Sequence, residues 1–269
     1  MSPEFSRRKF VGLCGFGAVG FGITSRSPAL AAQTTPTVAT VSSVTGDLVA
    51  ANRILARQQI VDAFGHVSVR HPMNRDHFLL ARSLAPALVE AYDIQEYDLD
   101  GNPIDARARP SYLERFIHSE VYRAQRDVNA VVHCHTPSLI LFGVTGVPLR
   151  PVYHQSAFIS EGIPIFEIRN AGGMTDMLVK TAPLGKALAQ TLGAKPAALM
   201  RGHGAVVVGD SIPTVVGRSV YLDVNARLQT EAAALGGVVT YLDPEEARLY
   251  LAPNNYDRAW ELWRREVNR

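Results

Sequence analysis

The chain has 269 residues, of which 47% are hydrophobic and 19% charged, and this composition is typical of a globular protein with one sizeable core. No apolar run reaches the roughly 18 residues of a membrane span, so we expect no stable membrane anchor. The formal net charge is only +2, and no basic patch indicates a nucleic-acid partner.

The N-terminus has the layout of an export signal. Arg7 and Arg8 form a twin arginine, a weakly apolar stretch follows over residues 11–23, and "ALA" at residues 29–31 is a small-x-small cleavage signal. We therefore expect residues 1–31 to engage the twin-arginine export machinery, which places the protein in the periplasm.

The rest of the chain is expected to form a lead-in and one domain. Residues 32–46 are rich in Thr, Ser and Ala and predict a flexible lead-in, whereas residues 47–269 predict a single domain with a helical C-terminal tail. Residues 1–31 carry a net charge of +3, so their removal leaves a net charge near −1. Cys134 is then the one cysteine left, and no disulfide can form within the chain.

Hydrophobic periodicity predicts alternating helices and strands in the first half of the domain. Apolar residues at helical spacing predict a helix over residues 47–62, and alternation predicts a strand in "GHVSVR" with "HFLLAR" as its hairpin partner. The Gly-Asn tip of "EYDLDGNPID" predicts a further strand–turn–strand. Another helix is expected over residues 112–127, with Pro110 at its start and Ser111 as its N-cap.

The second half continues this alternation. The expected elements are, in order, a strand over residues 129–135, a short helix over 138–142, a strand over 163–169, a helix over 183–193, a hairpin turned at Gly202-His203-Gly204, a long helix over 213–235 and a helical tail from Pro244. Together these elements predict one α/β domain around a mixed, mostly antiparallel sheet.

The stretch "NAVVHCHTPS" contains the first candidate site. Side chains alternate along a strand, so His133 and His135 share one face while Cys134 lies on the other. Two imidazoles at this separation can chelate one divalent ion. The bare spacing also fits two polar residues on the solvent face of a strand, so the site depends on what else converges there.

Three further residues could join the two histidines. Glu114 and His118 lie four residues apart on one face of the helix expected before the strand. His203 stands between two glycines, at a turn that leaves its imidazole uncluttered. Three neutral imidazoles with a nearby carboxylate match a catalytic zinc or similar ion that keeps a coordination position open.

This ordered set resembles a known family. "ERFIHSEVYRAQRDVNAVVHCH", followed about seventy residues later by "RGHG", is similar to the class II aldolase/adducin family, and the similarity extends over about residues 50–235. The resemblance implies a three-layer α/β/α sandwich with a central, mostly antiparallel sheet. It also implies that His133, His135 and His203 bind the metal and that Glu114 is the acid/base beside it.

The resemblance carries further expectations about cofactor and assembly. Zinc is the expected metal, with manganese, cobalt or iron as alternatives, and His118 is expected to pack beside the ligands rather than to bind the ion. As in the aldolases of the family, we expect a homotetramer with active sites at subunit interfaces. The other expected partner is a small-molecule substrate.

The sequence departs from the sugar-phosphate aldolases where they hold phosphate. His66 stands in place of their asparagine, Gln155 follows His154 where they have a proton-donating tyrosine, and "ARSLAP" replaces their Thr-Gly pair. For Arg70 and Arg82, a surface or interface ion pair is an open alternative to substrate binding. The residues expected in the substrate site suit a carboxylate or phenolic oxygen at least as well as phosphate, and they are His66, Arg70, Arg82, His154 and Arg201.

These expectations predict a divalent-metal-dependent lyase. The predicted reaction is aldol cleavage or decarboxylation of a small, non-phosphorylated hydroxy-carbonyl or hydroxy-aromatic acid, through a metal-stabilised enediolate. The same electron sink would also serve an epimerase or dehydratase of a sugar derivative. A third alternative is a non-catalytic, adducin-like binding or scaffold protein, because the same fold supports both kinds of role.

Overall fold

The computed structural model describes residues 40–251 and 256–268, so the expected export signal lies outside the described residues. Its centre is a seven-stranded sheet formed by β1 (His66–Arg70), β2 (His77–Ala81), β3 (Ile94–Asp98), β4 (Ala130–Cys134), β5 (Ile165–Phe166), β6 (Ala197–Met200) and β7 (Gly204–Gly209). The strand order is β3-β2-β1-β4-β7-β6-β5. Neighbouring strands pair antiparallel except β5 and β6, which confirms the mostly antiparallel sheet.

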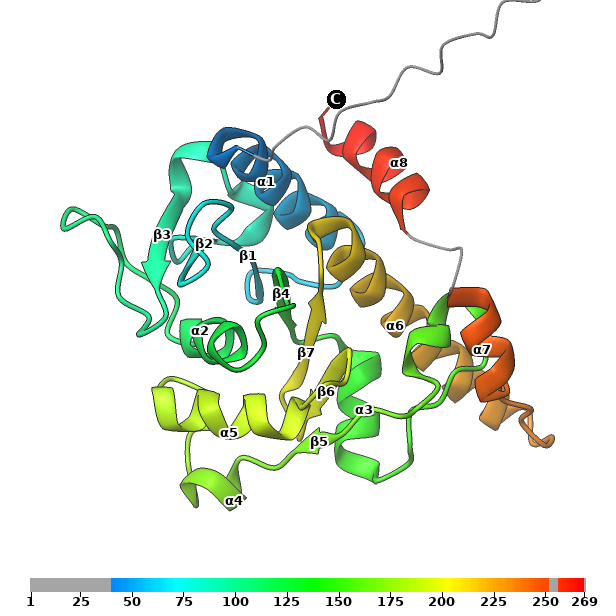
Figure 1. Cartoon of the computed structure of the whole chain (residues 1–269). Helices are drawn as coiled ribbons and strands as arrows, with labels where there is room; N and C mark the ends of the chain where they lie inside the picture. The colour runs from blue at the N-terminus through cyan, green and yellow to red at the C-terminus, as the bar shows by residue number, and fades with distance from the viewer. Residues whose placement is uncertain (1–39, 252–255, 269) are drawn as a thin grey trace, which may run out of the picture. The chain divides into compact units, whose positions relative to one another are not determined.

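Helices cover both faces of the sheet (Figure 1). The helices are α1 (Val41–Arg57), α2 (Arg115–Ala124), α3 (Pro137–Thr145), α4 (Arg169–Gly172), α5 (Ala182–Leu192), α6 (Ile212–Ala234), α7 (Pro244–Leu251) and α8 (Asp257–Val267), with 3-10 turns η1 (Pro86–Leu88), η2 (Ala91–Asp93) and η3 (His154–Ile159). Among the residues described, no helix is both long and apolar enough to pass through a membrane.

Two hydrophobic cores lie between the sheet and its helices, one on each face of the sheet. One core joins α1 and α6 to sheet residues that include Val132 and Val207, and the other joins α2 and α5 to residues that include Val131 and Val206. Successive residues of β4 and β7 therefore point to opposite faces, as strand geometry requires. The three-layer α/β/α sandwich is confirmed, and Cys134 is buried in the α1/α6 core as expected.

Helix α1 begins earlier than the sequence predicts. The Thr40 hydroxyl accepts from the Ser43 backbone N–H at 3.2 Å, and the Ser43 hydroxyl accepts from the Thr40 backbone N–H at 3.1 Å. This reciprocal cap starts the helix at Val41, so residues 41–46 of the expected flexible lead-in are helical. The helix also ends earlier, at Arg57, two residues before Gln59 adopts a φ of +59°.

Helix α2 begins later than predicted, which matters for the site. Ser111 is not its N-cap, because the Ser111 hydroxyl instead accepts from the Tyr97 hydroxyl at 2.9 Å. The Tyr112 hydroxyl donates to the Leu84 carbonyl, so this segment is tied to a neighbouring loop rather than coiled into the helix. Glu114 occupies the N-cap position, and its side chain extends from the start of the helix instead of lying on a helical face.

Strand β5 and the C-terminal tail complete the fold. Strand β5 spans only two residues of the seven expected, because the chain turns into α4 directly after Glu167 and Ile168. The predicted helical tail is present as α7 and α8. Trp260 and Trp263 of α8 are buried in the core that holds α1 and α6, so the tail is part of the domain.

Candidate metal centre and its cavity

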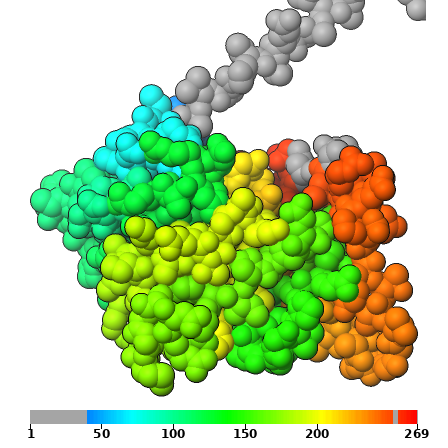
Figure 2. Space-filling view, turned by 60° about the horizontal axis from the view of Figure 1, so that its bottom comes forward, coloured from blue at the N-terminus to red at the C-terminus, as the bar shows by residue number. Residues whose placement is uncertain are grey.

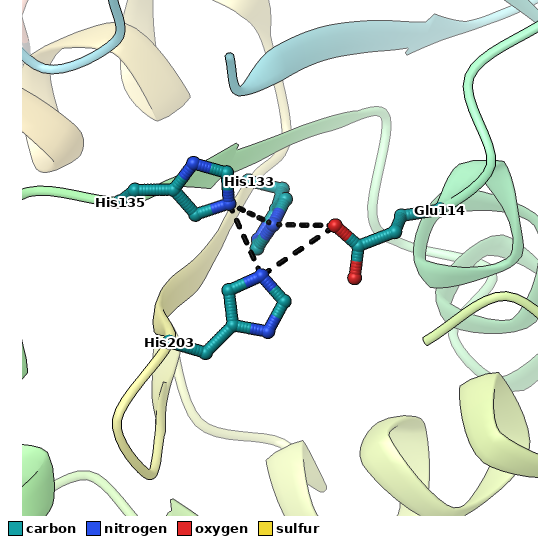
Figure 3. Close-up of side chains that lie close together, drawn as sticks. All are labelled: Glu114, His133, His135 and His203. Atoms are coloured by element: carbon teal, nitrogen blue, oxygen red, sulfur yellow. Dashed lines mark hydrogen bonds and ion pairs between the residues drawn. The ribbon is translucent and has the colours of Figure 1, made fainter. Parts of the chain in front are cut away.

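Four side chains converge on one point at the C-terminal end of β4 (Figure 3). His133 Nε2 lies 3.0 Å from His135 Nε2, which lies 3.1 Å from His203 Nε2. Glu114 Oε2 lies 3.4 Å from His133 Nε2 and 3.5 Å from His203 Nε2. Each residue offers one ligand atom, and these four atoms lie within 4.8 Å of one another, so the cluster could hold a metal ion.

The sheet brings these residues together from distant parts of the sequence. His133 is on β4, His135 follows the end of that strand, and His203 lies in the turn between β6 and β7. Gly204 allows the turn to approach β4, because a Cβ atom there would lie 1.9 Å from the Cys134 carbonyl oxygen. Without a side chain at Gly204, the backbone can place His203 beside His135.

Backbone carbonyls set the tautomers of two of the histidines. His133 Nδ1 lies 3.1 Å from the Ala205 carbonyl oxygen, and His203 Nδ1 lies 3.0 Å from the Met177 carbonyl oxygen. A carbonyl only accepts, so each Nδ1 carries the proton and each Nε2 lone pair faces the cluster. Metal-binding histidines are commonly oriented in this way, and the donor set therefore fits a divalent transition ion.

The electrostatics of the cluster favour an ionised Glu114 and a neutral His135. Burial raises the pKa of Glu114, but His133 and His203 beside its Oε2 atom lower that pKa more, so it lies well below its usual range. The Val179 backbone N–H donates to Glu114 Oε1 at 2.8 Å, which leaves Oε2 facing the histidines. Burial lowers the pKa of His135 to about 4, so this ligand is unprotonated at neutral pH.

A cavity of about 360 Å³ adjoins the cluster and is a candidate substrate site. Its lining includes Glu114, His135 and His66, together with apolar side chains such as those of Leu113 and Leu178. A second cavity, of about 410 Å³, also reaches His135 but does not include Glu114 or His66. The first cavity therefore has the predicted acid/base, one predicted ligand and one predicted substrate residue at the same place.

His66 lines this cavity and contacts the buried His118 behind it. His66 Nδ1 lies 2.6 Å from His118 Nε2, and the His66 ring centroid is 5.1 Å from that of His133. His118 is fully buried and is not one of the four clustered residues. His66 lines the cavity where the resemblance placed a substrate contact, and its role there stays a prediction.

Arg70 lies elsewhere, which corrects the expectation that it binds substrate. It lies at the opposite end of β1 from His66. Its guanidinium donates to the backbone carbonyls of Tyr122, Gln125 and Val128 at 3.0, 2.8 and 2.9 Å. These bonds hold the end of α2 against the sheet, and the arginine does not line the cavity.

Arg82 and Arg201 also lie outside the lining of the cavity. Arg82 Nε lies 2.7 Å from the buried carboxylate of Asp93, and this is the ion-pair alternative that the sequence left open. Arg201 Nε lies 2.6 Å from Glu167 Oε2. Both guanidinium groups are paired with carboxylates of the chain itself, and a contact of either arginine with substrate stays a prediction.

His154 is the fourth expected substrate residue that the structure places outside the cavity. It begins η3, and its ring packs against Tyr153 and against Tyr250 of α7, with centroids 5.1 and 5.0 Å away. Within one chain, it packs against the C-terminal tail.

Sequence reasoning missed several residues that shape the site. Tyr112 lines the cavity with its ring centroid 4.6 Å from that of His66, and burial raises its pKa to about 12, so it stays a neutral phenol. Met177 and Val179 act through backbone groups, which no side-chain pattern reveals.

Comparisons with known proteins agree with this geometry. A family model described as Class II Aldolase and Adducin N-terminal domain matches residues 46–230. Decarboxylase tropJ from Talaromyces stipitatus is 35% identical over 239 residues, which cover 80% of this chain and 90% of that protein. A 3,4-dihydroxyphthalate decarboxylase from Arthrobacter keyseri is 29% identical over 233 residues, which cover 81% and 90%.

A solved structure extends the comparison to the fold. The L-fuculose 1-phosphate aldolase from Glaciozyma antarctica PI12 matches with a TM-score of 0.69 and 25% identity, covering 87% of this chain and 91% of that chain. The chain therefore belongs to the class II aldolase and adducin family. With decarboxylases among its relatives, it is an enzyme, a carbon–carbon lyase, rather than a non-catalytic scaffold.

Proposed function

We propose that the chain is a divalent-metal-dependent decarboxylase of a small, non-phosphorylated hydroxy-aromatic acid. The observation that carries the proposal is the largely apolar cavity beside three imidazoles whose Nε2 atoms converge. The relatives named as decarboxylases support the reaction, and the 3,4-dihydroxyphthalate decarboxylase supports an aromatic acid with adjacent hydroxyls. Zinc is the metal we propose first, because histidine and carboxylate ligands suit it.

The charge of the cavity argues against a phosphorylated substrate. Its lining contains no lysine or arginine, and its polar side chains are those of His66, Ser83, Tyr112, Glu114 and His135. A phosphodianion would face neutral donors and a carboxylate there, with no cation from the chain to offset its desolvation. Aromatic rings suit the remaining lining, which is largely apolar.

The same neutral lining suits the loss of carbon dioxide. A carboxylate that departs as neutral carbon dioxide gives up its charge to the rest of the substrate in the transition state. A fixed cation on that carboxylate would bind the ground state more tightly than the transition state and would slow the step. Neutral donors such as Tyr112 orient the carboxylate without that penalty.

The chain's own groups have clear tasks in such a reaction. His133, His135 and His203, with Glu114 nearby, would hold the ion, which when bound supplies positive charge for the electron pair left by bond cleavage. Glu114 lines the cavity and begins ionised, so its Oε2 atom can take a proton from a substrate hydroxyl and return it to the carbon that lost its carboxyl group. The Val179 N–H fixes the other oxygen and so orients the carboxylate.

The test is carbon dioxide release by protein loaded separately with zinc, manganese, cobalt or iron(II). The substrates are hydroxybenzoates and hydroxyphthalates, including 3,4-dihydroxyphthalate. We expect release from acids with adjacent oxygens, with about one ion per chain, and loss of both in the His133→Ala/His135→Ala double variant. His77→Ala is the matched control, because His77 binds Glu96 on the β2–β3 pair and is not part of the cluster.

Aldol cleavage of a non-phosphorylated hydroxy-carbonyl acid is the second candidate. The likeness of the fold to the fuculose-phosphate aldolase favours it, since the same electron sink serves both reactions. Aldehyde release from hydroxy-keto acids, without carbon dioxide release from any aromatic acid, would replace the first proposal with this one. Metal-loaded protein that turns over neither panel would contradict both.

Export and assembly stay proposals. We propose a periplasmic homotetramer, and exposed apolar side chains on one face support contact with another copy of the chain. Leu141 and Val144 of α3 are 49% and 53% exposed, and Val147 after the helix is 50% exposed. Figure 2 shows the green α3 segment on the same face as the yellow-green α4–α5 segment. Cell fractionation and the mass in solution test these two proposals separately.

A further inference from the structure

Four buried polar side chains form a continuous chain of hydrogen bonds behind the cavity. Tyr122 Oη lies 2.8 Å from Ser68 Oγ, Ser68 Oγ lies 2.6 Å from His118 Nδ1, and His118 Nε2 lies 2.6 Å from His66 Nδ1. We call these four residues the Tyr122 relay. Three of them have no exposed surface and His66 is 4% exposed, so their hydrogen bonds are made within the protein.

The chemistry of its two ends gives the Tyr122 relay a direction. A phenol is a better donor than an alcohol, and an imidazole nitrogen is a better acceptor than an alcohol. Tyr122 therefore donates to Ser68, and Ser68 donates to His118 Nδ1. In the reverse direction the Tyr122 proton would need another acceptor, and the other backbone contact of its hydroxyl, with Val131, comes from an N–H that only donates.

Arg70 strengthens this direction. Its guanidinium carbon lies 4.7 Å from the centroid of the Tyr122 ring, and a cation over the ring makes the phenol a stronger donor. The same positive charge disfavours arrangements of the relay that build positive charge near Tyr122. The arginine that sequence reasoning assigned to substrate thus lies at the far end of a chain that leads to the cavity.

The direction of the relay determines which nitrogen of His66 carries its proton. His118 accepts at Nδ1, so its single proton is on Nε2 and is donated to His66 Nδ1. Burial lowers the pKa of His118 to about 3, so this ring stays neutral. His66 Nδ1 is then an acceptor, and the proton of the neutral His66 ring is on Nε2.

We propose that the Tyr122 relay holds His66 as a neutral Nε2–H donor that binds a carboxylate or phenolic oxygen of the substrate in the cavity. The inference rests on the proposed function, because it assigns the substrate contact of that site. His66 lines the cavity between Tyr112 and His133. Tyr122, Ser68 and His118 are positioning residues, since they act on the substrate only through His66.

The first measurement is the tautomer of His66 in the intact chain. Nitrogen-15 NMR on histidine-labelled protein without metal distinguishes protonated from unprotonated ring nitrogens, and loss of the signals in His66→Gln assigns them. We expect Nε2 protonated and Nδ1 unprotonated at neutral pH. A proton on Nδ1 would overturn the inference whatever the substrate is, and this measurement does not require activity.

The second measurement uses Tyr122→Phe with a matched control. The substitution removes the terminal donor while keeping the ring, so Ser68 can reverse and His66 can exchange tautomers. Tyr97→Phe removes another buried hydroxyl on the same face of the sheet, one that pairs with Ser111 outside the relay. We expect mixed His66 tautomers in Tyr122→Phe and the wild-type tautomer in Tyr97→Phe.

The affinity for a substrate-like probe depends on the His66 Nε2–H donor and can be measured without turnover. With zinc-loaded protein and protocatechuate as the probe, we expect Tyr122→Phe to raise the dissociation constant about tenfold, the usual cost of weakening a buried hydrogen bond. On a substrate that turns over, KM should rise while kcat changes little. Equal affinity in wild type and Tyr122→Phe would overturn the inference, whereas the expected tautomer and affinities without carbon dioxide release would overturn the proposed reaction alone.

Discussion

Glu114 is the residue on which most of the proposed chemistry depends. Its carboxylate is held by the Val179 N–H on one oxygen and faces the histidines with the other. The low pKa of this group keeps it ionised throughout the neutral range, so it begins as a base or ligand and not as an acid. One side chain therefore combines charge for the ion with a site for proton transfer.

Replacing this carboxylate should separate those two tasks. In Glu114→Gln the Val179 contact and the side-chain volume are kept, but no proton can be moved at this position. We expect kcat to fall by about 10²–10⁴-fold, the usual range for loss of a general acid or base. Zinc content should stay near one ion per chain, measured by elemental analysis, because three histidines remain. Full activity would show that another group transfers the proton.

The neutral histidines should make stability depend on pH. Burial lowers the pKa of His118 to about 3 and that of His66 well below its usual 6.5. Below about pH 6.5 the unfolded chain binds protons that the folded chain does not, so the free energy of unfolding falls as the pH falls. For His118 the slope approaches about 1.4 kcal/mol per pH unit until the pH nears about 3.

Urea unfolding of the metal-free protein between about pH 7.5 and about pH 4.5 measures this dependence. His118→Gln should flatten the slope, although it lowers the stability at neutral pH by disrupting the buried hydrogen bonds. A wild-type slope no greater than that of the variant would contradict the argument.

At the scale of elements, the contact between β4 and the β6–β7 turn holds the candidate metal site together. Gly204→Ala would place a Cβ atom 1.9 Å from the Cys134 carbonyl oxygen, so the strands must separate. We expect a loss of a few kcal/mol in the free energy of unfolding and a lower zinc affinity, because His203 moves with the turn. Thermal unfolding with and without zinc measures both effects.

Gly46→Ala is the matched control for this substitution. Gly46 lies within α1, and a Cβ atom there meets nothing within 4 Å. Alanine is the better helix former, so we expect stability to stay the same or to rise by up to about 1 kcal/mol. Equal effects of the two substitutions would contradict the role assigned to Gly204.

Sequence patterns predicted these elements better than they predicted their ends. Periodicity located the strands around His133 and the hairpin around His203, because alternation and glycine turns are local properties. The start of α2 depended on Tyr112 reaching the Leu84 carbonyl, a contact between residues 28 positions apart in sequence. Such contacts are decided by the tertiary fold, and the position of Glu114 as N-cap was therefore not predicted.

The candidate site could also be predicted only in part from the sequence. Glu114 and the three histidines could be recognised from their order, and the structure brings them together. The arginines could not be placed, because strand parity gives the face of a side chain but not its partners. Arg70 shares the face of His66 on β1, yet it binds backbone carbonyls at the other end of the strand. Arg201 forms an ion pair with Glu167, which directly follows β5.

At the scale of the whole molecule, α8 fastens the C-terminus to the layer formed by α1 and α6. Trp263 is 8% exposed, and Arg264 lies 3.0 Å from Asp47 of α1. We expect Trp263→Ala to lower the free energy of unfolding by about 3–5 kcal/mol through lost burial and a cavity. Leu262→Ala, at a neighbouring position that is 56% exposed, should cost less than about 0.5 kcal/mol. Chemical denaturation measures both, and equal losses would contradict the docking of α8.

The position of the tryptophans has a spectroscopic consequence. The chain has two tryptophans, and both lie on α8. Selective excitation of indole therefore reports on one helix, while the sheet and the metal centre contribute no signal of their own. A red shift in emission marks the departure of α8 into water, and far-ultraviolet circular dichroism marks the loss of the fold. If the emission changes first on denaturation, the C-terminal helix leaves a sandwich that is still intact.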